Sequence, residues 1–356
     1  MKEGSRNVTN IKDLKLAEID FVRAISVFSV IMIHVSANYV ELLGLGFLMN
    51  QWSRFAVPLF LLLSGLVLHL PRAQRPSATI FYRQRFGKIL IPYLLWSIFY
   101  VLFTAFTNRL PIAWSNLPSA LIYGTGYYHL YFVIILLQLY LLYPLLSKWL
   151  RRTPLLCLSL SFALTFCCEI ILYLAMFSKI ILPHASSPIY LVAFPSWLFF
   201  FILGMYLSIS YTSLKSKLLH YNWQILVLWL LCFALFYLEG KAFGSYRSSI
   251  RLMTIPYACS SGLALLTLPL IFPFPQLLQR ICSWLARQGF LIYLLHPTIL
   301  TILLLLGNWL GPSLGIGSFI GLYLATAGLS IISILALQHL PGINYLGGFH
   351  QSPNHK

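Results

Sequence analysis

The sequence predicts an all-α, polytopic integral membrane protein with about ten transmembrane helices. Of its 356 residues, 59% are hydrophobic and only 9% are charged, whereas about 25% of residues are charged in an ordinary soluble domain. Mean hydropathy is +0.83. Apolar runs of about 17–25 residues, each long enough to cross roughly 30 Å of hydrocarbon, recur along nearly the whole chain.

In chain order, we expect the spans at 19–40, 52–70, 89–107, 128–147, 155–178, 189–209, 223–239, 252–272, 289–307 and 316–338. No connection is long and polar enough to form a second, soluble domain. We therefore expect one transmembrane domain, 19–338, between an N-terminal segment, 1–18, and a C-terminal tail, 339–356. The N-terminal segment lacks the apolar core and cleavage site of a signal peptide, so the first span is expected to serve as the insertion signal.

The connections between these spans alternate in their content of Lys and Arg. From the N-terminus onward they hold 4, 0, 5, 1, 3, 1, 2, 2, 2, 0 and 1 of these residues. The side that carries the N-terminus holds 17 of the 24 Lys and Arg, and the opposite side holds 4. This positive-inside pattern predicts a multi-pass protein of the cell membrane with both termini in the cytoplasm. The asymmetry also explains the net charge of +17, so nucleic acid is not an expected partner.

The six cysteines lie in or beside spans and lack the spacing of a metal site, so we interpret them as apolar packing residues. The sequence contains no P-loop, no dinucleotide-binding glycine motif and no strong repeat of the kind found in transporters with inverted halves. We therefore expect neither a metal nor a bound cofactor.

The first span, "IDFVRAISVFSVIMIHVSANY" (19–39), is apolar but contains Arg23 and His34. Eleven residues correspond to about three helical turns, so the two side chains share one face, roughly 16 Å apart along the axis. Asp20, Asn38 and Glu41 continue this face. Because polar groups that face lipid are unfavourable, the stripe is expected to line a water-accessible passage.

Spacing alone leaves the roles of His34 and Arg23 open. His34 lies too deep for its side chain to reach water along the helix. It is either a packing histidine hydrogen-bonded to a neighbouring helix or a base, since a histidine shielded from water stays neutral and can accept a proton. Arg23 lies nearer the cytoplasmic surface and is either a structural partner of Asp20 or a functional residue.

The segment "PRAQRPSATIFYRQRFGKILIPY" (71–93) places Arg83 and Arg85 directly before the third span. Its cations hold the topology and can contact anionic lipid, and spacing alone favours this interpretation. Two arginines that converge on one point would instead bind a phosphorylated ligand at the cytoplasmic mouth. They converge only in an extended or loosely turned backbone, since residues two apart on a helix diverge by about 200°.

Other polar residues inside the spans are His129, Glu169, Glu239 and His296. An embedded Glu169 must be protonated or paired across helices, and His34 is one partner that we consider. Pro297 follows His296, and a proline within a span frees a backbone carbonyl and is typical of a kink.

Taken together, these segments resemble the bacterial membrane-bound acyltransferases of family 3, which include O-acetyltransferases of cell-surface polysaccharides. The resemblance covers nearly the whole chain. Family members read I-D-x-x-R-(x10)-H in their first span, which Ile19, Asp20, Arg23 and His34 match. The other matching segments are "SRFAVPLFLLLSG" (53–65), "FYRQRFGKILIPY" (81–93), "YHLYFVIILLQLYLLYPLL" (128–146), "FPSWLFFFILGMYL" (194–207) and "IYLLHPTIL" (292–300).

The chain departs from the family pattern in two places. Tyr131 stands where many members have Trp, and Gly289 and Phe290 stand where many have Ser-Tyr before the late histidine span. The second departure weakens the expectation that His296 belongs to the site.

The resemblance implies transfer of an acyl group, usually acetyl, from cytoplasmic acyl-CoA to a hydroxyl of an extracytoplasmic or lipid-linked cell-surface glycan. It implies that His34 acts as general base or transient acyl acceptor, and that Arg23 orients the donor or polarises its thioester. Arg83 and Arg85 would contact the CoA phosphates. The residues expected to support the site are Asp20, Asn38, Glu169 and His129. The implied partners are acyl-CoA, a glycan or glycolipid acceptor, and membrane lipids.

A second hypothesis is a transporter or flippase of a cell-surface polysaccharide intermediate. It accounts for the hydrophobicity and for the polar stripe, but not for the arginines gathered at one mouth.

Overall fold

The computed structural model describes residues 16–71, 77–112, 114–177, 179, 188–244, 250–310 and 315–349. These residues form helices, turns and loops and contain no strand, which confirms the all-α prediction. Most of the predicted N-terminal segment 1–18, the basic connection 72–76 and the last part of the tail 339–356 lie outside the described residues. In chain order the elements are α1 (Ala17–Ser36), α2 (Gly44–Ser53), α3 (Ala56–His69), α4 (Ala78–Asn108), η2 (Trp114–Asn116), α5 (Leu117–Tyr123), α6 (Tyr131–Arg152), α7 (Pro154–Met176), α8 (Ile189–Val192), η3 (Phe194–Trp197), α9 (Leu198–Ile209), α10 (Tyr211–His220), α11 (Asn222–Phe243), α12 (Thr254–Ile271), α13 (Gln276–Leu310), α14 (Ile316–Leu337) and η5 (Ile343–Leu346).

The predicted spans appear in the predicted order. Within the described ranges, nine elements are long and apolar enough to cross a membrane, with α2 and α3 forming one of them. The sixth predicted span, 189–209, corresponds to a broken element, because Phe194–Ile209 is followed by α10 at a bend of 95°. The protein is therefore an all-α multi-pass membrane protein.

Two helices begin well before the spans that the sequence predicts. The helix α4 starts at Ala78 rather than near 89, and α13 starts at Gln276 rather than near 289. The Ser77 side chain caps α4 by accepting a hydrogen bond from the Ile80 backbone N–H at 3.4 Å. Arg83 and Arg85 consequently lie on a continuous helix, not in the extended connection that would let them converge.

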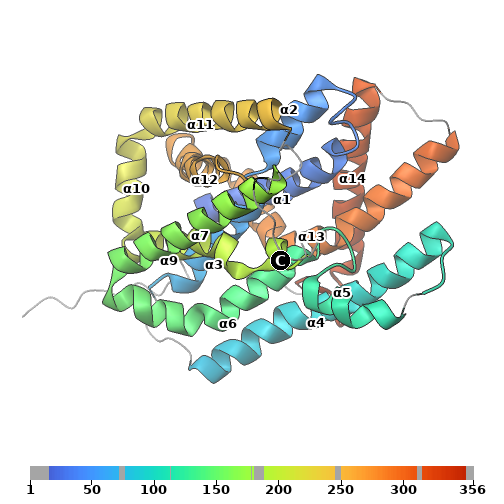
Figure 1. Cartoon of the computed structure of the whole chain (residues 1–356), viewed down its shortest axis with the longest axis horizontal. Helices are drawn as coiled ribbons and strands as arrows, with labels where there is room; N and C mark the ends of the chain where they lie inside the picture. Colours follow the sequence, from blue (N-terminus) through green and yellow to red (C-terminus); the bar gives the residue numbers. More distant parts are fainter. Residues whose placement is uncertain are drawn as a thin grey trace, which may run out of the picture.

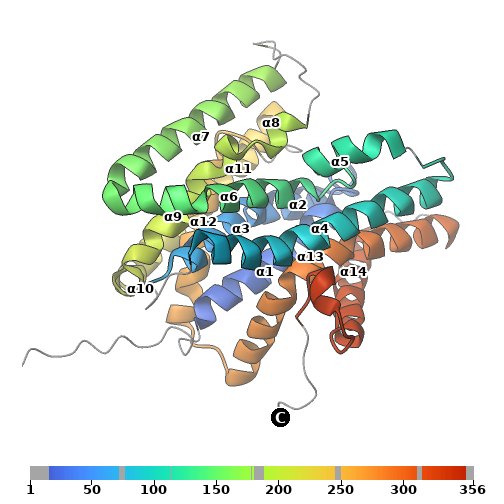
Figure 2. The same cartoon turned by 90° about the horizontal axis from the view of Figure 1, so that it is seen from below.

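The helix α1 lies in the interior of the bundle (Figures 1 and 2), where it packs against α2, α3, α12, α13 and α14. More than half of α1 is buried (56%), whereas 22% is buried in each of α7, α11 and α14. The outer helices therefore present most of their apolar surface to lipid, and the polar residues of α1 face other helices.

The tightest helix contact joins α3 and α9 through reciprocal glycines. A Cβ atom at Gly65 would collide with the Phe201 carbonyl oxygen, and one at Gly204 would collide with the Leu62 carbonyl oxygen. Small residues of this kind let the backbones of membrane helices approach closely. Both glycines belong to segments that carry the family resemblance, so part of that resemblance reflects packing.

Candidate active site

The ring of His34 lies in the last turn of α1 and contacts two other rings. Its centroid is 4.6 Å from the Tyr128 ring and 5.4 Å from the His296 ring, whose plane is inclined to it by 30°. Tyr128 belongs to the loop between α5 and α6, and His296 belongs to α13. The fold thus brings three distant segments of the described chain together at His34.

His296 is fully buried beside His34. Its Nδ1 lies 3.1 Å from the Ile292 carbonyl oxygen, and because a carbonyl only accepts hydrogen bonds, Nδ1 carries the proton. Its Nε2 is buried and has no hydrogen-bond partner among the described residues. His296 therefore holds one ring nitrogen on the backbone of its own helix and, within the described chain, leaves the other without a partner beside His34. His296 thus lies beside His34 although Gly289 and Phe290 depart from the family pattern.

His129, a predicted supporting residue, also lies next to His296. Their ring centroids are 5.9 Å apart, and the Tyr293 ring lies 5.1 Å from His129. Neither ring nitrogen of His129 has a partner in the described part of the chain, while its carbonyl oxygen accepts a hydrogen bond from the Tyr293 hydroxyl. We call His34, His129 and His296 the histidine cluster. They form no group suited to a metal ion within the described residues.

The histidine cluster lies between two sides of the bundle, which we call the Tyr128 side and the Arg23 side. The Tyr128 side is the side at which α1 ends. There Asn38 and Glu41 are exposed, and the Asn38 amide donates a hydrogen bond to the His34 carbonyl oxygen at 3.1 Å. This predicted supporting residue therefore lies one turn beyond His34 and holds the end of the helix.

The Arg23 side is the side at which α1 begins. Asp20 and Arg23 both keep part of their surface accessible, whereas Val22 and Ala24, which flank Arg23, are buried, as the predicted polar stripe requires. Asp20, Tyr140 and Arg85 all lie within electrostatic reach of Arg23. The fold therefore brings Arg85 of α4 towards Arg23 of α1.

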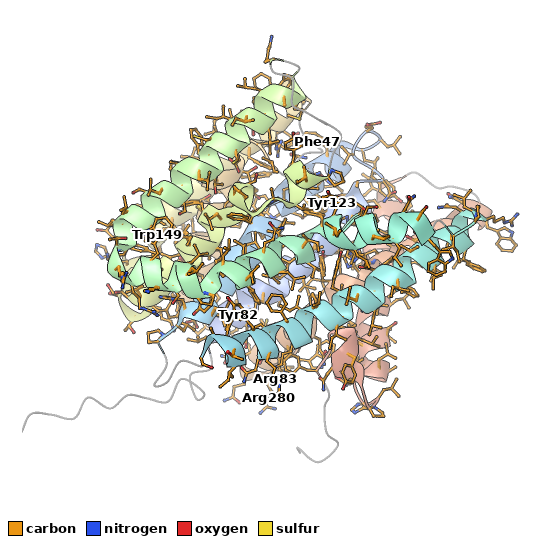
Figure 3. All side chains as sticks on the ribbon, turned by 60° about the horizontal axis from the view of Figure 1, so that its bottom comes forward. Phe47, Tyr82, Arg83, Tyr123, Trp149 and Arg280 are labelled. Carbon is orange, nitrogen blue, oxygen red and sulfur yellow. The ribbon has the colours of Figure 1, made fainter. Side chains whose placement is uncertain are left out.

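Arg83 does not share this position. It is exposed, whereas Arg85 is half-buried, and Figure 3 shows it at the outer edge of α4. The physical reason is the helical backbone, which directs side chains two residues apart to different sides. The converging pair of arginines that would grip one phosphate is thus not formed, and Arg85 is the member that belongs to the site.

Sequence reasoning did not assign Arg54 to the site. Arg54 follows α2 at the break before α3 and lies within electrostatic reach of His34. Its Nε donates to the Asn50 side-chain oxygen at 3.0 Å. The Asn50 amide donates in turn to the Ile33 carbonyl oxygen at 3.1 Å and to the Ser36 hydroxyl at 3.0 Å. Asn50 therefore ties Arg54 to the turn of α1 that carries His34.

This polar network continues across the bundle. The Gln51 amide donates to the Asn50 side-chain oxygen at 3.2 Å, and Arg251 donates from Nη2 to Gln51 Oε1 at 2.9 Å. Arg251 is fully buried and its guanidinium carbon lies 3.6 Å from the centroid of the Phe236 ring. The sequence carried a signal for this network in "NQWSR" (50–54), where several polar residues stand together at a predicted span boundary.

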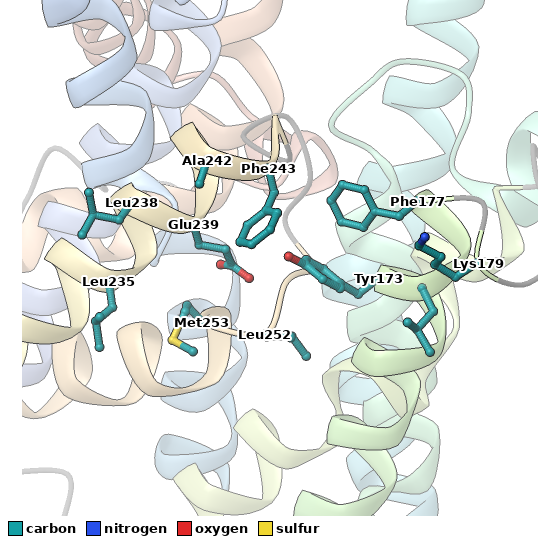
Figure 4. Close-up of a pocket in the computed structure, with 11 residues that line it drawn as sticks. Tyr173, Phe177, Lys179, Leu235, Leu238, Glu239, Ala242, Phe243, Leu252 and Met253 are labelled. Atoms are coloured by element: carbon teal, nitrogen blue, oxygen red, sulfur yellow. The ribbon is translucent and has the colours of Figure 1, made fainter.

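Glu169 does not pair with His34. It is buried within electrostatic reach of Glu239, near a cleft of about 860 Å³ between α7 and α11. In this cleft the Glu239 carboxyl and the Tyr173 hydroxyl point towards one another, flanked by the rings of Phe177 and Phe243 (Figure 4). The described lining of the cleft includes no member of the histidine cluster, so Glu169 belongs to a separate region.

The acyltransferase domain family matches residues 16–337, from the start of α1 to the end of α14. The chain is a member of acyltransferase family 3. Comparison with curated proteins and with solved structures gave no match.

The candidate site of this acyltransferase combines two imidazole rings with cations on both sides of them. His34 and His296 provide the rings. Arg23 and Arg85 lie towards one side of the bundle, and Arg54 lies near the other end of α1. This arrangement can bind an anionic donor on the Arg23 side, remove a proton at His34, and stabilise negative charge that develops nearby.

Proposed function

We propose that this acyltransferase transfers an acyl group, such as acetyl, from cytoplasmic acyl-CoA to a hydroxyl of an extracytoplasmic or lipid-linked cell-surface glycan. The observation that carries the proposal is the position of His34 between an arginine pair, Arg23 and Arg85, and the accessible Tyr128 side. The alternation of basic connections supports a cytoplasmic Arg23 side, where acyl-CoA is available.

In the direct route, the acceptor oxygen attacks the thioester carbonyl carbon while its proton passes to His34. The C–S bond then breaks, and His34 returns the proton to the CoA sulfur, so that the products are an O-acyl ester and free CoA. Arg54 is placed to stabilise the negative charge on the carbonyl oxygen during this step.

In the carrier route, a His34 ring nitrogen attacks the thioester carbonyl carbon first. The C–S bond breaks, the ring proton passes to the CoA sulfur, and an acyl-imidazole and free CoA form. The acceptor oxygen then attacks the acyl carbon, the bond between this carbon and the ring nitrogen breaks, and the acceptor proton returns to the ring. The two routes use the same residues but differ in their exchange reactions. Only the carrier route exchanges label between acetyl-CoA and added free CoA without any acceptor.

Purified protein in sealed vesicles with radiolabelled acetyl-CoA on the outside tests the proposed function. The expected result is label in a glycan or glycolipid acceptor supplied from a bacterial cell-envelope extract, with release of free CoA. A transporter or flippase would leave the label on CoA, and that result would overturn the proposal.

A further inference from the structure

A row of tyrosine rings leads from the interior of the site to the surface of the Tyr128 side. Tyr100 is fully buried and stacks on Tyr127 with centroids 4.3 Å apart and planes 17° apart. The Tyr127 ring lies 4.6 Å from that of Tyr128, which is 48% exposed. The Tyr127 hydroxyl lies 2.6 Å from the Thr301 hydroxyl of α13. Exposure therefore increases along the row, and Tyr128 ends it.

The loop that carries Tyr128 begins with a tight turn at Gly124, which a larger residue could not replace. Gly124 has φ +67°, which favours glycine, and a Cβ there would lie 2.7 Å from the Tyr131 Cα at the start of α6. His129 and Leu130 follow directly and are buried. The loop is thus anchored on both sides of Tyr128 and leaves this ring half exposed, 4.6 Å from His34.

Tyr100 and Tyr127 already anchor the row inside the protein, so the exposed part of the Tyr128 ring beside His34 can contact a ligand. The face of an aromatic ring carries negative electrostatic potential. The C–H groups on the apolar face of a pyranose carry weak positive charge, so the two surfaces attract and exclude water between them. A linear alcohol or a small lipid head group has no such apolar ring face to stack on an aromatic side chain.

We propose that Tyr128 is the stacking platform for a pyranose ring of the acceptor, an inference that rests on the proposed acyl transfer and names its acceptor class. A sugar ring on this platform directs the hydroxyls at its edge towards the neighbouring His34 ring. The side-chain oxygen of the exposed Asn38, one turn beyond His34, is available to accept a hydrogen bond from another hydroxyl, while the amide nitrogen donates to the His34 and Val35 carbonyl oxygens. The platform then selects which ring binds, and His34 acts on the hydroxyl that reaches it.

The test measures binding of the full-length protein in nanodiscs to an array of immobilised bacterial pyranose glycans, without acyl-CoA. We expect Tyr128→Leu, which keeps apolar contact with His34 but lacks an aromatic face, to bind roughly 3- to 10-fold more weakly than the wild type. Tyr128→Phe should bind within about twofold of it, because the ring remains.

Tyr221→Leu is the matched control. Tyr221 is 49% exposed and its ring lies 4.5 Å from that of His220, but it lies between α10 and α11, outside the site. It should bind as the wild type does. Equal binding by Tyr128→Leu and the wild type would overturn the inference, as would wild-type protein that binds no pyranose on the array.

These failures can be told apart from failure of the proposed function. Because the array contains no donor, it reports on the sugar platform alone. Vesicles in which label moves from acetyl-CoA to an acceptor, combined with an unchanged Tyr128→Leu on the array, would retain the acyl transfer and reject the platform.

Discussion

The imidazole rings of His34 and His296 lie 5.4 Å apart between centroids, with planes 30° apart, although 261 positions of sequence separate them. The two residues come from α1 and α13, which pack along each other in the centre of the bundle. The Nε2 of His296 is buried there without a hydrogen-bond partner among the described residues.

His296→Phe keeps an aromatic ring against His34 but removes both nitrogens. We expect acyl transfer to fall roughly 10²-fold, because a positioned acid–base group contributes at least this much, while the amount of folded protein stays unchanged. His339→Phe, near the end of α14, is the control and should keep full activity. Unchanged transfer in His296→Phe would make this histidine a packing residue.

Arg85 and Arg83 should differ in their effect on the donor. Arg85 lies within electrostatic reach of Arg23, whereas Arg83 is exposed. Arg85→Ala is therefore expected to raise the KM for acyl-CoA roughly tenfold, the effect of losing one charged hydrogen bond. Arg83→Ala and the exposed Lys88→Ala should leave it within about twofold of the wild type. Equal effects of the two arginine variants in steady-state assays would contradict the assignment.

Arg54 should act on the rate of transfer rather than on donor binding. Arg54→Gln is expected to lower kcat roughly 10²-fold, since loss of one group that stabilises an oxyanion has about this cost, with the KM for acyl-CoA unchanged. Arg287→Gln is a close control, because Arg287 also donates to a side-chain oxygen four residues earlier, Ser283 Oγ, at 3.0 Å but lies exposed. A raised KM with normal kcat would place Arg54 in donor binding instead.

The reciprocal glycines of α3 and α9 should limit stability. Gly65→Ala forces a Cβ against a backbone carbonyl that cannot move alone, so we expect about 1–3 kcal/mol of destabilisation. Gly328→Ala in α14 meets nothing within 4 Å and should be neutral or slightly stabilising. Denaturation of the purified variants in mixed micelles compares them, and equal unfolding midpoints would rule out the close contact.

Much of the fold was predictable because hydrocarbon thickness fixes the length of an apolar span. The spans around His34, Glu169 and Tyr323 all appear where the hydropathy of the sequence places them. The start of α4 was not predictable in this way, because its first turns contain Arg83 and Arg85 and extend beyond the apolar run. A helix that continues into a polar environment leaves no mark in hydropathy.

Periodicity could predict site residues only along α1, whereas His129 and Arg85 were expected from the family resemblance. Periodicity within one helix places Asp20, Arg23, His34 and Asn38 on one face, and their partial accessibility agrees with this. The neighbours of His34 come from other helices, and no periodicity within α1 reports on them. This is why Tyr128 and Arg54 were missed and why Glu169 was considered as a partner of His34, although it lies near Glu239.

The most direct test of the account compares His34→Gln with His34→Ala in the vesicle assay, normalised to folded protein in the membrane. Glutamine keeps hydrogen bonding and approximate size but cannot accept a proton at neutral pH. We therefore predict that both variants insert normally and that both lose transfer by roughly 10²–10⁴-fold. Substantial transfer by His34→Gln would contradict the account, because it would show that the His34 ring only fills space.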